Sequence, residues 1–262
     1  MSQKSLPASL RLVTTAINAA LYAIVGVLSA PLPTFFGIRI WPQVFVPASF
    51  AVLFGPWTGG VGAAIGIFLA DVIYGHHDAL LSLLVGVPAN FLGFYVIGWL
   101  TQRNHGKLMK NILFLFSLLI PILLAVYGLY YISEGTSAAQ IVLGFVWLVG
   151  IPAVAIIALK AIRSRWADFE MAASIGLGFG SVIIGVGLVA YSSIFALPSV
   201  LGLGGEPLPI TFIYGATAFT YLTEILALVV VTPVVVTACR AAFPSLRGFG
   251  AITRQARSGK RA

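Results

Sequence analysis

The sequence predicts an all-α fold, a polytopic integral membrane helix bundle with about eight membrane segments. Of its 262 residues, 60% are apolar and only 8% are charged, and the mean hydropathy is +1.04. A soluble domain of this size carries about a quarter charged residues, because water must solvate its surface. At roughly 20 residues per spanning helix, the chain holds at most about eight or nine spans, which argues against an attached enzymatic output module or nucleotide-hydrolysing domain.

Apolar runs interrupted by proline, glycine or charge divide the chain into the membrane segments. Six runs are long enough to span a bilayer. The second and third are short and are joined by Gly55-Pro56-Trp57-Thr58-Gly59-Gly60, so they form either two short tilted helices or a re-entrant pair. In order, the segments are residues 10–30, 43–55, 58–74, 80–101, 111–132, 138–160, 170–197 and 210–239.

The basic residues predict the topology, because Lys and Arg mark cytoplasmic loops. With the N-terminus inside, Arg39 is the only one of the 15 Lys and Arg that falls outside. We therefore expect a single transmembrane domain over 1–262 in the cell membrane, with cytoplasmic ends at 1–9 and 240–262 flanking the bundle at 10–239. The net charge of +8 then reflects topology and contact with anionic lipid, and not nucleic-acid binding.

A carboxylate near the middle of the last segment is the first candidate for a functional site, because ionisable groups within spans are expensive. Glu224 shares one helix face with four polar residues, Tyr214, Thr217, Thr220 and Tyr221. This stripe indicates a ligand-site carboxylate or a proton-coupled group. The alternative is an internal structural pair, or a protonated and hydrogen-bonded Glu.

A second intramembrane carboxylate, Asp71, lies about a turn from the outer end of the third segment. Asp71 either forms part of the wall of an outward-facing site or lies at the membrane interface, where it reaches water. His76, His77 and Asp78 follow it, but adjacent side chains seldom converge on one ion, so we expect no metal site. The single cysteine, Cys239, excludes an internal disulfide and a cysteine-ligated metal.

The first external loop, residues 31–43, carries Arg39 and Trp41. It forms either a lid over an apolar ligand with an anionic group or part of the aromatic belt at the membrane interface. In the fourth segment, Asn90 lies beside Pro88. Asn90 either contacts a ligand or bridges helices through a backbone carbonyl that the proline frees.

The first segment has two different faces. Its small-residue face permits close approach of another helix, or packs inside the monomer, and comprises Ala16, Ala19, Ala20, Ala23 and Ala30. The opposite face is polar, comprises Thr14, Thr15, Asn18, Tyr22 and Ser29, and is expected to look into the bundle. This places Asn18 among the candidate ligand-site groups.

These residues resemble the substrate-binding S components of energy-coupling-factor (ECF) vitamin transporters, most strongly over residues 10–101. The resemblance rests on the A-x-x-x-A spacing of the first helix, the long first external loop, the run 46–56 continuing through the glycines of 59–62 to Asp71, and 90–98. Family members have about six helices, so an added pair within 111–197 is expected here.

The resemblance implies that Ala16, Ala19, Ala20 and Ala23 dock on a transmembrane coupling protein that carries two ATPases. It also implies that Arg39 and Trp41 belong to a loop that closes over a micronutrient. Since the chain has no GxxxxGK[ST] phosphate loop, partner ATPases must supply the energy. The sequence contains neither an HExxH nor a GxSxG motif, so we do not expect an enzyme, and no cofactor is expected.

The leading hypothesis is therefore a membrane-embedded subunit that binds a small organic micronutrient for uptake. Riboflavin-like, thiamine-like, biotin-like and nucleobase-like ligands are all compatible with it. Two alternatives stay open: an eight-helix membrane sensor whose output lies on another chain, and a stand-alone secondary transporter that uses Glu224 for proton coupling. The candidate ligand-binding residues are Asn18, Arg39, Trp41, Asp71, Asn90, Tyr214 and Glu224.

Overall fold

The fold is a bundle of long apolar helices. A computed structural model describes residues 7–29, 31–32, 34–35, 38–74, 78–103, 105–132, 155–157, 166–198, 206–244 and 246. Within these residues, six helices are long and apolar enough to cross a membrane. The described part of the chain holds one two-stranded antiparallel hairpin, in which Thr34 pairs with Arg39.

The first half of the chain forms α1 (Ala8–Leu28), the strands β1 (Thr34–Phe35) and β2 (Ile38–Arg39), the 3-10 turn η1 (Pro42–Val44), α2 (Phe45–Phe54) and α3 (Pro56–Tyr74). A continuous span follows, built from α4 (Ala79–Leu81), the π-helical turn η2 (Ser82–Gly86) and α5 (Val87–Gln102). The remaining helices are α6 (Lys107–Ile132), α9 (Ala167–Ser192) and α10 (Phe212–Ala242).

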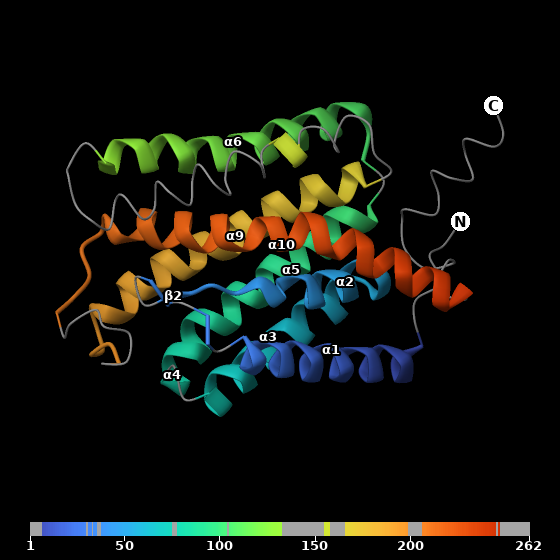
Figure 1. Ribbon diagram of the computed structural model, residues 1–262, viewed down its shortest axis with the longest axis horizontal. Helices are drawn as coiled ribbons and strands as arrows, with labels where there is room; N and C mark the ends of the chain where they lie inside the picture. Colours follow the sequence, from blue (N-terminus) through green and yellow to red (C-terminus); the bar gives the residue numbers. More distant parts are fainter. Residues whose placement is uncertain are drawn as a thin grey trace.

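The helices lie roughly side by side along the long axis of the molecule (Figure 1). α1 packs on α3, α5 packs between α3 and α9, and α10 contacts α9 and α2. β2 and α4 lie at one end of the bundle, which we call the hairpin end (Figure 1). The N-terminal end of α1 and the C-terminal end of α10 lie at the opposite end (Figure 1).

The predicted segments agree with the helices in part. Five of the six segments predicted to be long enough to span appear as spans among the described residues, and the other one, 138–160, lies almost wholly outside them. The third segment, predicted to be short, is also long enough to span, as Pro56–Ile73, whereas the second is the shorter apolar helix Pro42–Phe54. The predicted linker 55–60 is wrong, because α3 already begins at Pro56. Gly55 alone makes the turn, with a φ of 105° that favours glycine.

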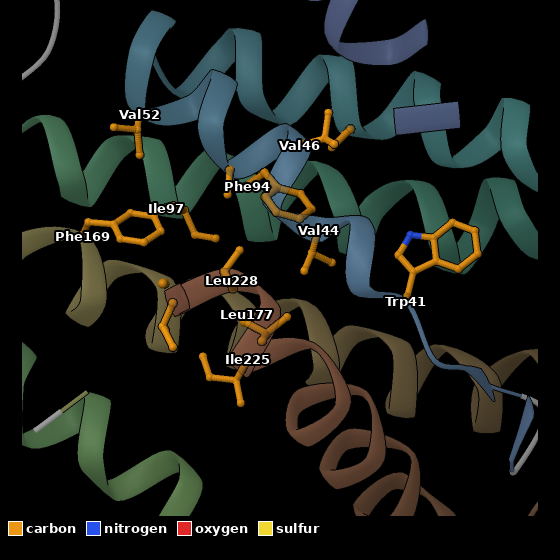
Figure 2. Packing of buried hydrophobic residues seen from close by; sticks show 14 of the residues in the cluster. Trp41, Val44, Val46, Val52, Phe94, Ile97, Phe169, Leu177, Ile225 and Leu228 are labelled. Atoms are coloured by element: carbon orange, nitrogen blue, oxygen red, sulfur yellow. The ribbon is translucent and has the colours of Figure 1, made fainter. Parts of the chain in front are cut away.

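The packed core lies between α2, α5, α9 and α10 (Figure 2). Phe94, Ile97, Leu177, Ile225 and Leu228 are buried there, and their side chains point toward one another. The outer faces of the helices are apolar as well. On α6, which packs mainly on α9, exposed side chains include Leu108, Leu115, Phe116 and Leu123. Such a surface fits hydrocarbon rather than water.

A buried amide joins α1 to α3. The Asn18 side chain is fully buried and its Nδ2 donates to the carbonyl oxygens of Thr58 at 2.9 Å and Gly59 at 3.3 Å. One turn further along α3, Gly62 leaves the space that this amide occupies, since a Cβ at Gly62 would collide with it. Small residues of α3 therefore allow the two helix backbones to approach closely.

Candidate functional site: a cavity at the hairpin end of the bundle

A cavity lies between β2, α1, α3, the α4–α5 span, α9 and α10. Its empty space amounts to about 900 Å³, a figure that includes space open to solvent. Its apolar walls come mainly from α5 and α9. The polar and aromatic side chains that line it are Tyr22, Arg39, Trp41, Asp71, Ser82, Asn90, Phe94, Ser181, Thr220 and Glu224.

Small residues allow α5 and α9 to pack closely on one side of the cavity. Gly93 of α5 and Gly176 and Gly180 of α9 all line it. A Cβ at Gly176 would come within 2.7 Å of the Gly93 carbonyl oxygen, and one at Gly180 within 3.2 Å of the Ala89 carbonyl oxygen. The glycines thus let the two helix backbones approach closely where they face the cavity.

An aromatic corner closes one side of the cavity. The Trp41 ring stands edge-on to the Tyr22 ring, with 6.3 Å between centroids, and Tyr22 is likewise edge-on to Phe94 at 6.1 Å. Trp41 also packs against Gly26 of α1, where a Cβ would lie 3.1 Å from the indole. Edge-to-face pairs of this kind are favourable, so these rings hold one another in place.

A relay of hydrogen bonds runs through this corner. Trp41 Nε1 donates to the Tyr22 hydroxyl at 2.8 Å, and that hydroxyl donates to Asn90 Oδ1 at 2.8 Å. Asn90 Nδ2 then donates to the Gly86 carbonyl oxygen at 2.9 Å, at the end of η2. The relay links the segment after β2 to α1 and to the α4–α5 span, so it sets the direction of each polar group on this wall.

The charged residues of the cavity lie at different depths. Arg39 is 3% exposed, and its guanidinium carbon lies 4.3 Å from the centroid of the Trp41 ring, a cation–π contact. Asp71 is also buried, and its Oδ2 accepts from the Ser82 hydroxyl at 2.6 Å. Glu224 lies further from the hairpin end, on α10. A buried cavity with two acids and one base can orient a polar ligand.

The structure brings five of the seven predicted ligand-site residues together on this cavity: Arg39, Trp41, Asp71, Asn90 and Glu224. The other two lie elsewhere. Asn18 binds the backbone of α3 and does not line the cavity, because its helix face is taken up by close packing. Tyr214 is 50% exposed and also lies off the cavity, about three turns nearer the start of α10 than Glu224.

Sequence reasoning missed several lining residues. Tyr22 was recognised only as part of the polar face of the first segment, although an aromatic hydroxyl within a span is itself a signal. Thr220 was recognised only as a neighbour of Glu224. Ser82 and Ser181 have no sequence signal, because serines in apolar helices commonly bond their own backbone, as Ser181 does to the Leu177 carbonyl oxygen at 2.8 Å.

The alanine face of α1 divides into two pairs. Ala19 and Ala23 are 4% and 5% exposed inside the bundle. Ala16 and Ala20, one A-x-x-x-A pair, are exposed on the outer surface of the helix. A partner helix that approached α1 from outside the bundle would therefore contact Ala16 and Ala20.

Residues His76 and His77 lie outside the described part of the chain, as does most of the basic tail. Asp78 caps α4 by accepting from the Leu80 N–H at 3.0 Å, and its Oδ2 accepts from Tyr191 at 3.1 Å. Within the described residues, no three His, Cys, Asp or Glu side chains gather as metal ligands would.

The fold and the cavity together define a class, a multi-pass membrane protein that encloses a small-molecule site between its helices. Comparison with family models narrows the class, because the model of the S component of the ECF-type riboflavin transporter matches residues 8–188. The chain belongs to this family. Neither the curated proteins nor the solved structures gave a match.

Members of this family are membrane-embedded substrate-binding subunits for vitamin-type uptake. They are transporter subunits and not enzymes, and they work with a module made of a transmembrane coupling protein and ATPases. The expectation of an ECF S component is thereby confirmed at the level of the family.

Proposed function

We propose that this chain binds riboflavin, or a closely related flavin, in the cavity at the hairpin end. The observation that carries the proposal is a cavity with an aromatic corner, in a chain that matches the model of the S component of the ECF-type riboflavin transporter. A flavin is a flat ring system with a polyol chain. Trp41, Tyr22 and Phe94 offer aromatic surface for the ring, and the nearby amide and carboxyl groups offer hydrogen bonds.

We propose further that the hairpin end faces the outside of the cell. Arg103, Lys107 and Lys110 lie at the opposite end, between α5 and the start of α6. There Lys110 pairs with Asp168 at 2.9 Å. Basic residues favour the cytoplasmic side. In this orientation the cavity is loaded from outside, and the ends of α1 and α10 opposite the hairpin are cytoplasmic.

The exposed pair Ala16 and Ala20 is the proposed contact for the coupling protein. Small side chains allow two helices to approach closely in the membrane, where packing supplies much of the attraction. The flanking residues Val13, Ile17 and Ile24 are exposed and apolar, as a helix–helix contact within lipid requires. ATP hydrolysis by the partner subunits would then act on the loaded protein through α1.

Purified protein in detergent is expected to quench riboflavin fluorescence with a stoichiometry of one to one. Aromatic stacking and burial both reduce flavin emission, so a fluorescence titration measures binding directly. Thiamine and biotin, added in a hundredfold excess, are expected to leave bound riboflavin in place. Displacement by either vitamin, or a titration without saturation, would contradict the assignment of a flavin.

Bulk at the alanine pair is expected to abolish uptake without affecting binding. In cells that contain the coupling protein and ATPases, Ala20→Leu should lower radiolabelled riboflavin uptake at least tenfold, because the larger side chain prevents close helix approach. The control is Val126→Leu, which adds one methylene at an exposed position of α6. Equal uptake by Ala20→Leu and the wild-type protein, or uptake without the ATPases, argues against this docking surface.

A further inference from the structure

Glu224 is a buried carboxyl with no protein partner among the described residues. Its side chain lines the cavity, and the residue is only 7% exposed. Within the described part of the chain it makes no hydrogen bond and no ion pair. Removing a carboxyl group from water without supplying a partner is unfavourable. The position is therefore suited to a group that arrives with the ligand.

The hydroxyl of Thr220 strengthens this observation. Thr220 lies one helical turn before Glu224, lines the same cavity and is 1% exposed. Its Oγ1 has no hydrogen-bond partner in the described structure. Two neighbouring polar groups on one face of α10 thus have unused hydrogen-bonding capacity, one of them a strong acceptor.

Other polar groups of the cavity are committed to one another. The N–H of Trp41 and the hydroxyl of Tyr22 are used in the relay that ends on Asn90. The Ser82 hydroxyl donates its hydrogen bond to Asp71. These donors are directed at protein acceptors, so they do not turn toward Glu224. No donor of the described residues is placed on Glu224, so a donor that arrives with the ligand can pair with it.

The depth of Glu224 indicates which part of the ligand it meets. Glu224 lies twelve residues into α10, about 18 Å from the helix start at a rise of 1.5 Å per residue. Phe94 and Leu177 lie at comparable depths along their own helices and are apolar. The Asp71–Ser82 pair lies close to the hairpin end. A polyol, with donors along its whole length, fits that polar end better than the deep one.

We propose that Glu224 recognises the amide-type edge of a planar heteroaromatic ring, accepting a hydrogen bond from its ring N–H. In a flavin this is the imide N3–H, which lies between two carbonyl groups. The inference rests on the proposed function, and it assigns a ring orientation and a specificity residue to that site. Glu224 follows the residues that the family model matches, 8–188, so the family match does not imply this role.

The test combines a ligand change with a residue change. Riboflavin and 3-methylriboflavin, which has a methyl group in place of the N3 hydrogen, are titrated against wild-type protein, Glu224→Leu and Glu224→Gln. Glu224→Leu is expected to weaken riboflavin binding about 10- to 100-fold, because the N–H loses its acceptor. Glu224→Gln keeps an acceptor oxygen and should stay within about fivefold of wild type.

The loss of affinity caused by methylation of the ligand and the loss caused by Glu224→Leu should not add. If Glu224 contacts N3–H, methylation weakens binding to wild-type protein, whereas Glu224→Leu binds the two ligands with closely similar affinity. The matched control is Thr223→Val on the same helix, because Thr223 bonds its own helix and does not line the cavity. Retained 3-methylriboflavin binding by Glu224→Leu also shows that the variant is folded.

The outcomes separate the inference from the proposed function. Wild-type protein that binds neither flavin overturns both. Wild-type protein that binds riboflavin, with additive losses or with no loss in Glu224→Leu, overturns the ring-edge assignment alone. A Glu224→Leu variant that binds neither ligand is checked by its unfolding temperature in detergent. If that temperature is unchanged, the N–H assignment is wrong, since the methylated ligand should have been retained.

Discussion

Trp41→Ala is expected to weaken riboflavin binding by about two orders of magnitude. The indole supplies ring surface to the cavity, and its centroid lies 4.3 Å from the guanidinium carbon of Arg39. Its N–H is the first donor of the relay through Tyr22. Its loss removes aromatic contact and leaves the Tyr22 hydroxyl without its donor. Truncation of a buried aromatic anchor in a binding site typically costs about 2–4 kcal/mol, and 1.4 kcal/mol is a factor of ten.

A graded series separates the two contributions of Trp41. Trp41→Phe keeps an aromatic ring but has no N–H, so we expect an intermediate loss of about tenfold. The control is Trp57→Ala, the same type of truncation at a tryptophan that is 54% exposed and packs on Phe91 and Tyr95 away from the cavity. Riboflavin titrations of all three variants measure the effect. Equal affinities for Trp41→Ala and Trp57→Ala would exclude Trp41 from the site.

Gly66→Ala is expected to destabilise the fold by forcing α1 and α3 apart. A Cβ at Gly66 would lie 2.8 Å from the Ala19 carbonyl oxygen and 2.9 Å from Tyr22 Cβ, so α1 has to move away from α3. Overpacking of this kind costs about 1–3 kcal/mol. We expect a fall of about 5 °C in the unfolding temperature in detergent, together with weaker riboflavin binding because Tyr22 is displaced.

Gly215→Ala is the matched control, since no heavy atom lies within 4 Å of a Cβ built at that position of α10. Alanine is a better helix residue than glycine, so this variant should be as stable as wild type or slightly more stable. Thermal unfolding followed by intrinsic fluorescence compares the two. A Gly66→Ala protein as stable as Gly215→Ala would show that the α1–α3 contact tolerates a wider spacing.

The sequence predicted most of the spans that the described residues contain, because each depends on a local sum of hydropathy. It also selected Arg39, Asp71 and Glu224 as charges that topology leaves unexplained, and all three line one cavity. It was less successful with Asn18, whose polarity looked functional. The Asn18 amide donates to backbone carbonyl oxygens of α3 instead. No local sequence pattern distinguishes a ligand-binding Asn from one that joins two helices.

The sequence by itself determined the membrane bundle and the small set of polar residues in it, since both follow from composition and helix periodicity. Only the tertiary structure decided which polar groups meet. The relay from Trp41 through Tyr22 to Asn90 joins three separate elements, and the burial of Ala19 beside the exposure of Ala20 depends on how α1 is rotated against α3. Helix rotation and spacing are set by the packing of neighbours, which are distant in the sequence.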